Sequence, residues 1–335
     1  MKIQLVTPGP LRLNNGNKIT AVRWSRILRG LGHKVDLVQH YSGISCDLLI
    51  ALHARRSYKS ILKFHELHAD LPLVVVLTGT DVYKDIQTDL EAQHSVKLAT
   101  RLIVLQKQAL AELPKDTLAK TRVIYQSAEP YKGQAPKKNK PFKVCVIGHL
   151  RAEKDPLRAA LAVRHIPGFS NLEVLHVGKA LDPALGKQAE AEAATNPRYS
   201  WVGELPYWMT RRVLARSHLL AITSQMEGSS NVLSEALASS VPVIASRIPG
   251  LMGTLGKEYP GFYPVGDTAA LAELLLRAEY DQEFYRSLKR ACERAAPLVQ
   301  PQREVASWKL VLRELEQWKL KHHLRNGREP RESNP

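Results

Sequence analysis

Short runs rich in Val, Ile and Leu alternate with amphipathic segments of helix length, and this alternation occurs twice along the chain. Such alternation is typical of parallel sheets with helices on both faces. The pattern therefore predicts an α/β protein with two Rossmann-like, doubly wound domains. The predicted strands are 3–6, 35–39, 47–51, 73–77, 102–105 and 123–125 in the first series and 143–147, 172–177, 199–202, 219–223, 241–245 and 262–265 in the second.

The polar segment 131–141, YKGQAPKKNKP, separates the two series, because neither a strand nor a helix there would have an apolar face to bury. We expect an N-terminal domain over 1–135, a C-terminal domain over 136–300, a helix over 301–324 and a disordered tail over 325–335. Ligands of doubly wound sheets bind outside the carboxyl ends of the strands. Two such sheets facing each other predict an interdomain cleft lined by the loops that follow the strands.

The chain carries 48 basic and 32 acidic residues, a net charge of +16 that favours an anionic partner. Residues 1–135 hold 19 basic and 11 acidic residues and so contribute +8, as does the remainder. This even spread, without a basic arm, disfavours nucleic-acid binding. Three scattered cysteines, Cys46, Cys145 and Cys292, predict neither disulfides nor a thiolate metal site. No apolar run is long enough for stable membrane insertion, so a cytoplasmic protein is expected, with a peripheral membrane contact left open.

Two loops carry candidates for phosphate binding. The loop after the first strand, TPGPLRLNNGN, places Gly16 before a predicted helix, whose first N–H groups can hold a phosphate. It lacks GxGxxG, and no acidic residue ends the second strand, which disfavours a nicotinamide dehydrogenase. The loop GHLRAEKDP, 148–156, offers Lys154 to stabilise a diphosphate leaving group, with Arg151 or His149 assisting.

The most informative segment runs from 224 to 250, SQMEGSSNVLSEALASSVPVIASRIPG. A strand ends before the loop EGSSN, and a helix starts near Asn231 with Ser230 or Asn231 as its N-cap. Donors at a helix start favour anionic or hydroxyl-rich ligands. Glu227 lies at the strand end and Glu235 on the flank of the helix. Because carboxylates accept hydrogen bonds from vicinal hydroxyls, a ribose and a hexose are natural partners of this pair.

These residues resemble the retaining glycosyltransferases of family 4, which have the GT-B fold and an E-x7-E motif, here Glu227 and Glu235. The resemblance extends to GHLRAEKD, WVGELP, VGDTAALAELL and the last helix, which it implies returns to the N-terminal domain. It implies that Glu227 contacts the transferred sugar, that Glu235 holds the donor ribose and that Lys154 binds the diphosphate, with no metal or other cofactor. His149 departs from the family, which has Arg there. The implied donor-binding residues are Gly16, Glu204, Leu205, Gly228, Ser229, Ser230, Asn231, Val232 and Glu235.

The segments ALHARRSYKSI, LTGTDVYKD and VIYQSAEP of the first half resemble the selenosugar synthase of selenoneine biosynthesis. This narrower resemblance implies that UDP-GlcNAc or UDP-glucose donates its hexose to selenophosphate, with formation of a C–Se bond. An anionic acceptor needs positive charge, which Arg55, Arg56 or Lys18 would supply. A family 4 enzyme with a hydroxyl acceptor and a non-catalytic nucleotide-sugar-binding protein remain alternatives. The implied acceptor-binding residues are Lys18, Arg55, Arg56, Thr78, Thr80, Asp81, Gln126 and Ser127.

Overall fold

The computed structural model describes residues 1–9, 15–136 and 140–325, with the side chains of 323–325 left out, and the chain forms two compact units. Unit 1 comprises Met1–Gln126 and Gln302–Pro335, and unit 2 comprises Ser127–Pro301. The division lies earlier than the predicted boundary at 135, so Ser127 belongs to unit 2. Part of the first loop (10–14), part of the predicted linker (137–139) and most of the predicted tail (326–335) lie outside the described residues.

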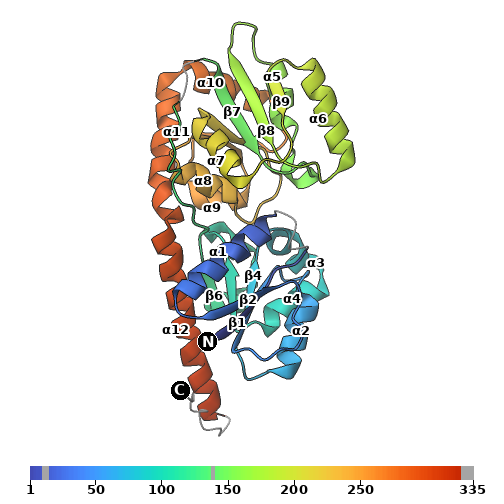
Figure 1. Cartoon of the computed structure of the whole chain (residues 1–335), viewed down its shortest axis with the longest axis vertical. Coiled ribbons are helices and arrows are strands. Elements are labelled where there is room, and N and C mark those ends of the chain that lie inside the picture. The colour runs from blue at the N-terminus through green and yellow to red at the C-terminus, as the bar shows by residue number, and fades with distance from the viewer. Residues whose placement is uncertain (10–14, 137–139, 326–335) are drawn as a thin grey trace. The chain divides into compact units, whose positions relative to one another are not determined.

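Unit 1 is built on a parallel sheet with the strand order β2-β1-β3-β4-β5-β6 (Figure 1). Successive side chains of a strand point to opposite faces, so β3 supplies Leu48, Ile50 and Leu52 to one apolar cluster and Leu49 and Ala51 to another. The sheet is therefore covered on both faces, as its uninterrupted apolar strands predict. The strands are β1 (Lys2–Val6), β2 (Lys34–Val38), β3 (Leu48–Leu52), β4 (Leu73–Leu77), β5 (Arg101–Val104) and β6 (Thr121–Val123).

The last helix, α12 (Pro301–Arg325), packs with α1 (Gly16–Gly30) on one face of this sheet. Trp308 meets Trp24 edge to face with ring centroids 4.8 Å apart. Glu304 is buried, and the cost of burying its carboxylate is offset by Trp24 Nε1, which donates to Oε1 at 2.6 Å, and by Arg23 Nε, 3.0 Å from Oε2. The opposite face is covered by α2 (Tyr58–Leu67) and α4 (Leu90–Leu98).

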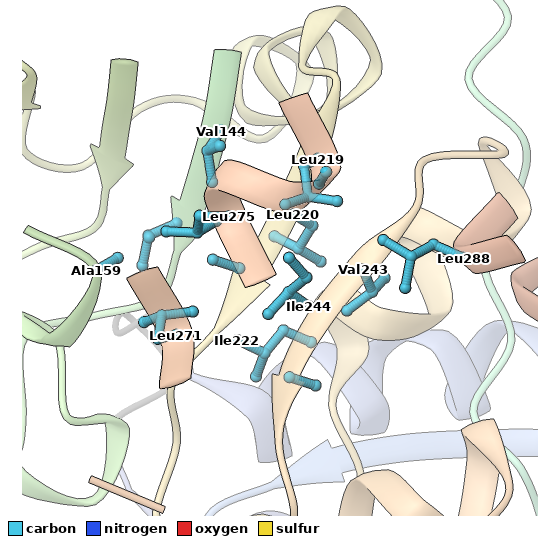
Figure 2. Packing of buried hydrophobic residues seen from close by; sticks show 14 of the residues in the cluster. Val144, Ala159, Leu219, Leu220, Ile222, Val243, Ile244, Leu271, Leu275 and Leu288 are labelled. Atoms are coloured by element: carbon cyan, nitrogen blue, oxygen red, sulfur yellow. The ribbon is translucent and has the colours of Figure 1, made fainter. Parts of the chain in front are cut away.

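Unit 2 repeats this architecture with the strand order β12-β11-β10-β7-β8-β9. Figure 2 shows its core, in which Leu271 and Leu275 of α10 pack with the strand residues Val144, Leu220 and Ile244. The strands are β7 (Phe142–Ile147), β8 (Leu172–Val177), β9 (Tyr199–Trp201), β10 (Leu219–Ile222), β11 (Val243–Ser246) and β12 (Phe262–Tyr263). The helices are α5 (Arg158–Arg164), α6 (Pro183–Thr195), α7 (Tyr207–Arg216), α8 (Asn231–Ala238), α9 (Pro249–Leu255), α10 (Thr268–Tyr280) and α11 (Gln282–Ala295).

Each sheet has one point where the order of the strands reverses. In unit 1 the chain moves from β1 to β2 and returns to the other side of β1 as β3, and in unit 2 it leaves β9 and returns beside β7 as β10. Crevices at the carboxyl ends of such strand pairs are where doubly wound sheets bind ligands. All twelve predicted strands are present, and the α/β class with two doubly wound domains is confirmed. None of the described helices has both the length and the apolar character needed to cross a membrane.

Candidate functional site

Lys154 and Glu227 meet at the reversal point of unit 2. Lys154 ends a 3₁₀ turn, η4 (Ala152–Lys154), in the loop that follows β7, and Glu227 lies in the loop that follows β10. The Lys154 Nζ donates to Glu227 Oε1 at 2.5 Å, and Ser224 Oγ donates to the same oxygen at 2.7 Å. The two charged side chains are 21% and 7% exposed. A charge-assisted hydrogen bond shielded to this extent is stronger than an ion pair on an open surface.

Two further hydrogen bonds join the loops that follow β7 and β10. The Gln225 N–H donates to the Glu153 carbonyl at 2.9 Å, and Thr223 Oγ1 donates to the Lys154 carbonyl at 2.9 Å. These bonds fix the backbone on both sides of the Lys154–Glu227 pair. The ammonium and the carboxylate are therefore held in place by one main-chain and one side-chain hydrogen bond between their loops as well as by their own attraction.

Two glycines allow neighbouring backbone segments to approach closely on either side of this pair. A Cβ on Gly250, near the start of α9, would lie 1.8 Å from the Glu227 carbonyl oxygen. A Cβ on Gly178, after β8, would lie 1.9 Å from the Gly148 carbonyl oxygen. Only a hydrogen fits at either position. The two glycines thus set the positions of Glu227 and of the loop that leads to Lys154.

The buried side chain of His176 contacts the loop that begins at Gly148 and leads to Lys154. His176 Nε2 lies 3.1 Å from the Gly148 carbonyl oxygen, and its Nδ1 lies 3.0 Å from the Tyr199 hydroxyl. Because a carbonyl can only accept, Nε2 carries the proton and Nδ1 accepts from Tyr199. Burial lowers the pKa of His176 to about 4, so the ring is neutral near pH 7.

The pair opens into a concavity of about 290 Å³, a volume that includes open solvent, with an apolar floor of strand residues. Its polar lining is supplied by Gly148, Lys154, His176, Thr223, Ser224 and Glu227. A small concave site with an apolar lining and a few convergent polar groups is typical of ligand binding. The apolar residues that line it are Val146, Ile147, Pro156, Ala221, Ile222 and Val232.

The start of α8 lies directly after Glu227. Ser230 is the N-cap residue with an extended backbone, φ −110°, and its side chain makes no capping hydrogen bond. The predicted N-cap and helix start are therefore in place, and Ser230 does not itself serve as the side-chain acceptor for the first turn. Gly228 and Ser230 are buried, whereas Ser229 and Asn231 are partly exposed. N–H groups at a helix start can hold an anion.

Glu235, on α8, lies in a polar network that the sequence did not reveal. Its carboxylate is buried and accepts a hydrogen bond from Tyr207. Burial of the phenol, followed by the negative charge of Glu235, raises the pKa of Tyr207. Arg211 Nη1 donates to the Tyr207 hydroxyl at 3.1 Å, and Arg211 Nη2 donates to the Glu129 carbonyl at 2.7 Å. The sequence signal was that the segment YWMTRR, 207–212, lies close after the predicted donor-binding residues Glu204 and Leu205.

The other predicted donor-side residues are more dispersed. His149 Nδ1 accepts the Lys179 N–H at 3.0 Å, which orients its ring toward the loop after β8. The Arg151 side chain is 46% exposed and lies 4.0 Å from Glu153, because Arg151 caps η4 with an extended backbone. The assistance of Arg151 or His149 at the diphosphate stays a prediction. Glu204 is exposed, Leu205 is partly buried, and Gly16 starts α1 in unit 1.

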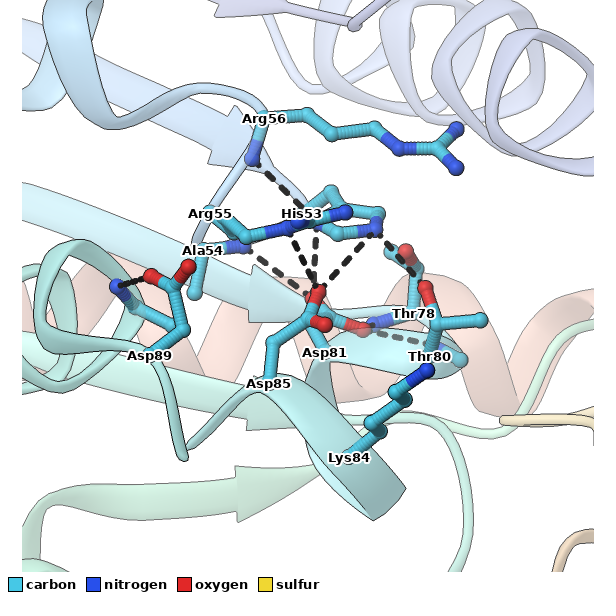
Figure 3. Close-up of polar contacts among 12 residues, drawn as sticks. His53, Ala54, Arg55, Arg56, Thr78, Thr80, Asp81, Lys84, Asp85 and Asp89 are labelled. Carbon is cyan, nitrogen blue, oxygen red and sulfur yellow. Dashed lines mark hydrogen bonds and ion pairs between the residues drawn. The ribbon is translucent and has the colours of Figure 1, made fainter. Parts of the chain in front are cut away.

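The predicted acceptor residues gather in part at the carboxyl ends of β3 and β4 in unit 1 (Figure 3). Arg55 and Arg56 follow β3, whereas Thr78 and Thr80 follow β4, and all four are partly or largely exposed. Arg55 Nε lies 3.1 Å from Asp85 Oδ2. Three neighbours, His53, Lys84 and Asp85, belong to the same group and were not predicted; they stand at strand ends or in the turn that follows.

Asp81 has a structural position instead of an exposed one. Its side chain is fully buried, and its Oδ1 accepts the N–H groups of Thr78 at 2.8 Å and Gly79 at 2.7 Å. Its Oδ2 accepts the Ala54 N–H at 3.1 Å. The Asp81 carboxylate thus joins the loops after β3 and β4 through their backbone N–H groups. Its role in acceptor binding stays a prediction.

Gln126 and Lys18 lie near the start of α1. Gln126 is buried, and its Nε2 donates to Thr20 Oγ1. Lys18 is partly exposed, and its backbone N–H donates to Asn15 Oδ1 at 2.9 Å. The described residues also contain no group of three or more His, Cys, Asp or Glu placed to hold a metal ion.

Two parallel, doubly wound domains are the architecture of the GT-B class of glycosyltransferases. Residues 127–295 match the model of the family "Glycosyl transferases group 1", and the chain belongs to that family. It is 23% identical over 284 residues to the "Glycosyltransferase 1 domain-containing protein 1" of Xenopus tropicalis, covering 75% of this chain and 80% of that protein.

Solved structures show the same fold over almost the whole chain. A sucrose-phosphate synthase from Thermosynechococcus elongatus superposes with a TM-score of 0.74 at 18% identity, covering 94% of this chain and 99% of that one. HepE from Anabaena, in complex with UDP-glucose, superposes with a TM-score of 0.73 at 17% identity, covering 95% and 100%. The predicted GT-B fold is thereby confirmed.

Proposed function

We propose that this glycosyltransferase transfers GlcNAc or glucose from a UDP-sugar to selenophosphate with retention of configuration at the anomeric carbon. The observation that carries the donor half is the Lys154–Glu227 pair at the reversal point of unit 2, beside the start of α8. The acceptor half is supported by the cationic and hydroxyl side chains after β3 and β4 and by the sequence resemblance of these segments to selenosugar synthases.

Each donor-side group has a role that fits its position. Charge develops on the departing diphosphate as the bond to the sugar breaks, and the Lys154 ammonium with the N–H groups of the α8 start would stabilise it. Glu227, held by Lys154 and Ser224, would orient the hexose hydroxyls, and Glu235 would accept the ribose hydroxyls. HepE, which shares the fold, is solved with UDP-glucose. Lys154 supplies the cation itself, so we expect no metal to take part.

The proposed reaction balances without an oxidant. The bond between the anomeric carbon and the diphosphate oxygen breaks, and UDP leaves with the electron pair. The selenium of selenophosphate forms the new C–Se bond. Water then attacks the phosphorus of the product and releases inorganic phosphate, which leaves a 1-selenosugar.

The test is to incubate the full chain with UDP-GlcNAc or UDP-glucose, with and without selenophosphate, and to analyse the products by mass spectrometry. A selenium-bearing sugar together with stoichiometric UDP supports the proposal. UDP release only with a glycan or lipid alcohol would show a hydroxyl acceptor instead. UDP-sugar binding without UDP release for any acceptor would show a non-catalytic binding protein.

A further inference from the structure

His53 occupies the reversal point of unit 1 with a strained backbone. It follows β3, beside β1 in the sheet order, and its φ of 71° lies in the left-handed region that residues other than glycine rarely adopt. The His53 N–H donates to the Val76 carbonyl of β4 at 2.8 Å, and its carbonyl accepts the Ser57 N–H at 3.0 Å. Strain of this kind persists where surrounding contacts over-determine it, and it is concentrated at functional sites.

The hydrogen bonds of the imidazole assign its proton. The Arg56 N–H donates to His53 Nδ1 at 3.4 Å, so Nδ1 is the acceptor nitrogen. The proton then lies on Nε2, which is 3.1 Å from Thr80 Oγ1. His53 therefore donates to the Thr80 hydroxyl, and that hydroxyl in turn directs its own hydrogen elsewhere. No acceptor for that hydrogen is found among the described residues, and Thr80 is only partly buried.

Charged side chains lie on both sides of the hydrogen-bonded pair His53–Thr80. Asp81 Oδ2 lies 3.8 Å from Nδ1, and Asp85 Oδ2 lies 3.9 Å from Nε2. The Asp81 carboxylate already accepts three backbone N–H groups, and Asp85 is paired with Arg55. Both carboxylates are buried, whereas the Arg55 and Arg56 side chains are exposed, so the outer rim of the group is cationic.

Lys84 adds a further exposed cation from the same turn. It lies in η1 (Asp81–Asp85), a single π-helical turn, a form that is frequent at functional sites. Figure 3 draws Lys84 with Thr78 and Thr80 in the same group. A small anion at this rim would meet a hydroxyl donor and cationic side chains, a combination that suits a phosphate-type oxyanion.

We propose that His53 is a positioning residue, which holds the Thr80 hydroxyl as a hydrogen-bond donor to a small tetrahedral oxyanion on unit 1. This inference rests on the proposed function, since that anion is the acceptor. It adds a residue that acts through Thr80 and does not itself touch the substrate. The imidazole is buried and partnered at both nitrogens, so it is suited to orienting a neighbour.

The experiment compares three variants of the full chain: His53→Asn, Thr80→Val and the double variant. Asn tolerates a positive φ, so His53→Asn keeps the backbone while removing the donor at the Nε2 position. Thr80→Val keeps the shape and removes the hydroxyl. His94→Asn is the matched control, because His94 Nδ1 pairs with the Tyr58 hydroxyl in the same unit, 3.0 Å away.

The readout is the KM for selenophosphate at saturating UDP-sugar, together with the Kd for UDP from calorimetry. We expect each single variant to raise the KM about 10-fold, the order of a hydrogen bond to a charged group. The double variant should show no further rise, and the UDP Kd and the control should stay at wild-type values. Additive effects in the double variant, or an unchanged KM in either single variant, would overturn the inference.

A separate measurement keeps the two proposals distinguishable. Calorimetry with inorganic phosphate and with selenophosphate reports anion binding without turnover. If the wild-type chain makes no selenosugar but binds either anion, and both variants weaken that binding equally, the acceptor identity fails and the role of His53 stands. If the wild-type chain binds neither anion, the role of His53 fails.

Discussion

Replacing Gly250 by alanine tests whether backbone contact positions the donor site. Gly250 is the second residue of α9, and an added Cβ would lie 1.8 Å from the Glu227 carbonyl oxygen, whereas real Cβ atoms essentially never come closer than 3.0 Å. The two segments must therefore separate by at least 1.2 Å. A displacement of that size taken up by Glu227 would break its 2.5 Å hydrogen bond with Lys154 Nζ.

The expected losses follow from this displacement. Overpacking costs about 1–3 kcal/mol of the free energy of unfolding, and a misplacement of about 1 Å at a reacting centre costs about 100-fold in turnover. Without the contact the substitution would stabilise the protein, since alanine in a helix is favoured over glycine by about 1 kcal/mol. The Gly250→Ala variant should therefore lose both melting temperature and turnover.

The assay combines thermal unfolding with UDP release from the UDP-sugar. Two controls match the substitution: Gly30→Ala, in helix α1, and Gly168→Ala, in unit 2, where nothing lies within 4 Å of the added Cβ. Both should keep wild-type turnover. If Gly250→Ala turned over UDP-sugar within two-fold of the wild-type chain, backbone contact would not be what positions Glu227.

Lys154→Ala should lower kcat about 100-fold, since it removes a charged donor to the developing anion, and an unchanged rate of UDP release would contradict its role. Glu235→Ala should raise the Kd for UDP in calorimetry; Tyr207→Phe should lower that Kd, because the phenol that occupies the carboxylate in the free protein is gone. The folded state keeps His176 neutral, so the contribution of this group to the free energy of unfolding is present in full above pH 6.5. It is lost as the pH falls toward 4. In urea unfolding, the free energy of unfolding of the wild-type chain should fall by about 2 kcal/mol between pH 7 and 5, and that of His176→Gln should lack this fall. An equal dependence of the free energy of unfolding on pH in both chains would refute this.

The strands were predictable because a strand buried on both faces of a sheet is a continuous run of apolar residues in the sequence. All five residues of β4 are buried, and the prediction of 73–77 matches its bounds. Lys154 and Glu227 were predictable as well, since both follow strands whose carboxyl ends carry ligands. The order of strands in the sheet was not accessible, and it is this order that makes the loops after β7 and β10 neighbours. The pairing of ammonium and carboxylate therefore emerged only with the structure.

The sequence did not reveal how exposed each side chain at these strand ends is. Asp81 and Arg55 both belong to loops after strands, yet one carboxylate is fully buried on backbone N–H groups and the other side chain reaches solvent. The sequence does not show which side chain after a strand becomes buried, because a carboxylate can join two loops as well as it can bind a ligand. His53 was overlooked for the same reason, although it stands directly after a buried strand.

The two units position their functional side chains by different physical means. In unit 2 the positioning groups are hydrogens on Gly178 and Gly250, which leave room for carbonyl oxygens that any side chain would displace. In unit 1 the positioning group is a side chain, the His53 imidazole, on a backbone held at positive φ. The sequence does not show whether a glycine is needed for a turn or for a close backbone contact. The contacts that position Glu227 could therefore not be predicted from the sequence. The second site is visible as a histidine at a strand end, and it becomes interpretable once Thr80 is seen to be its partner.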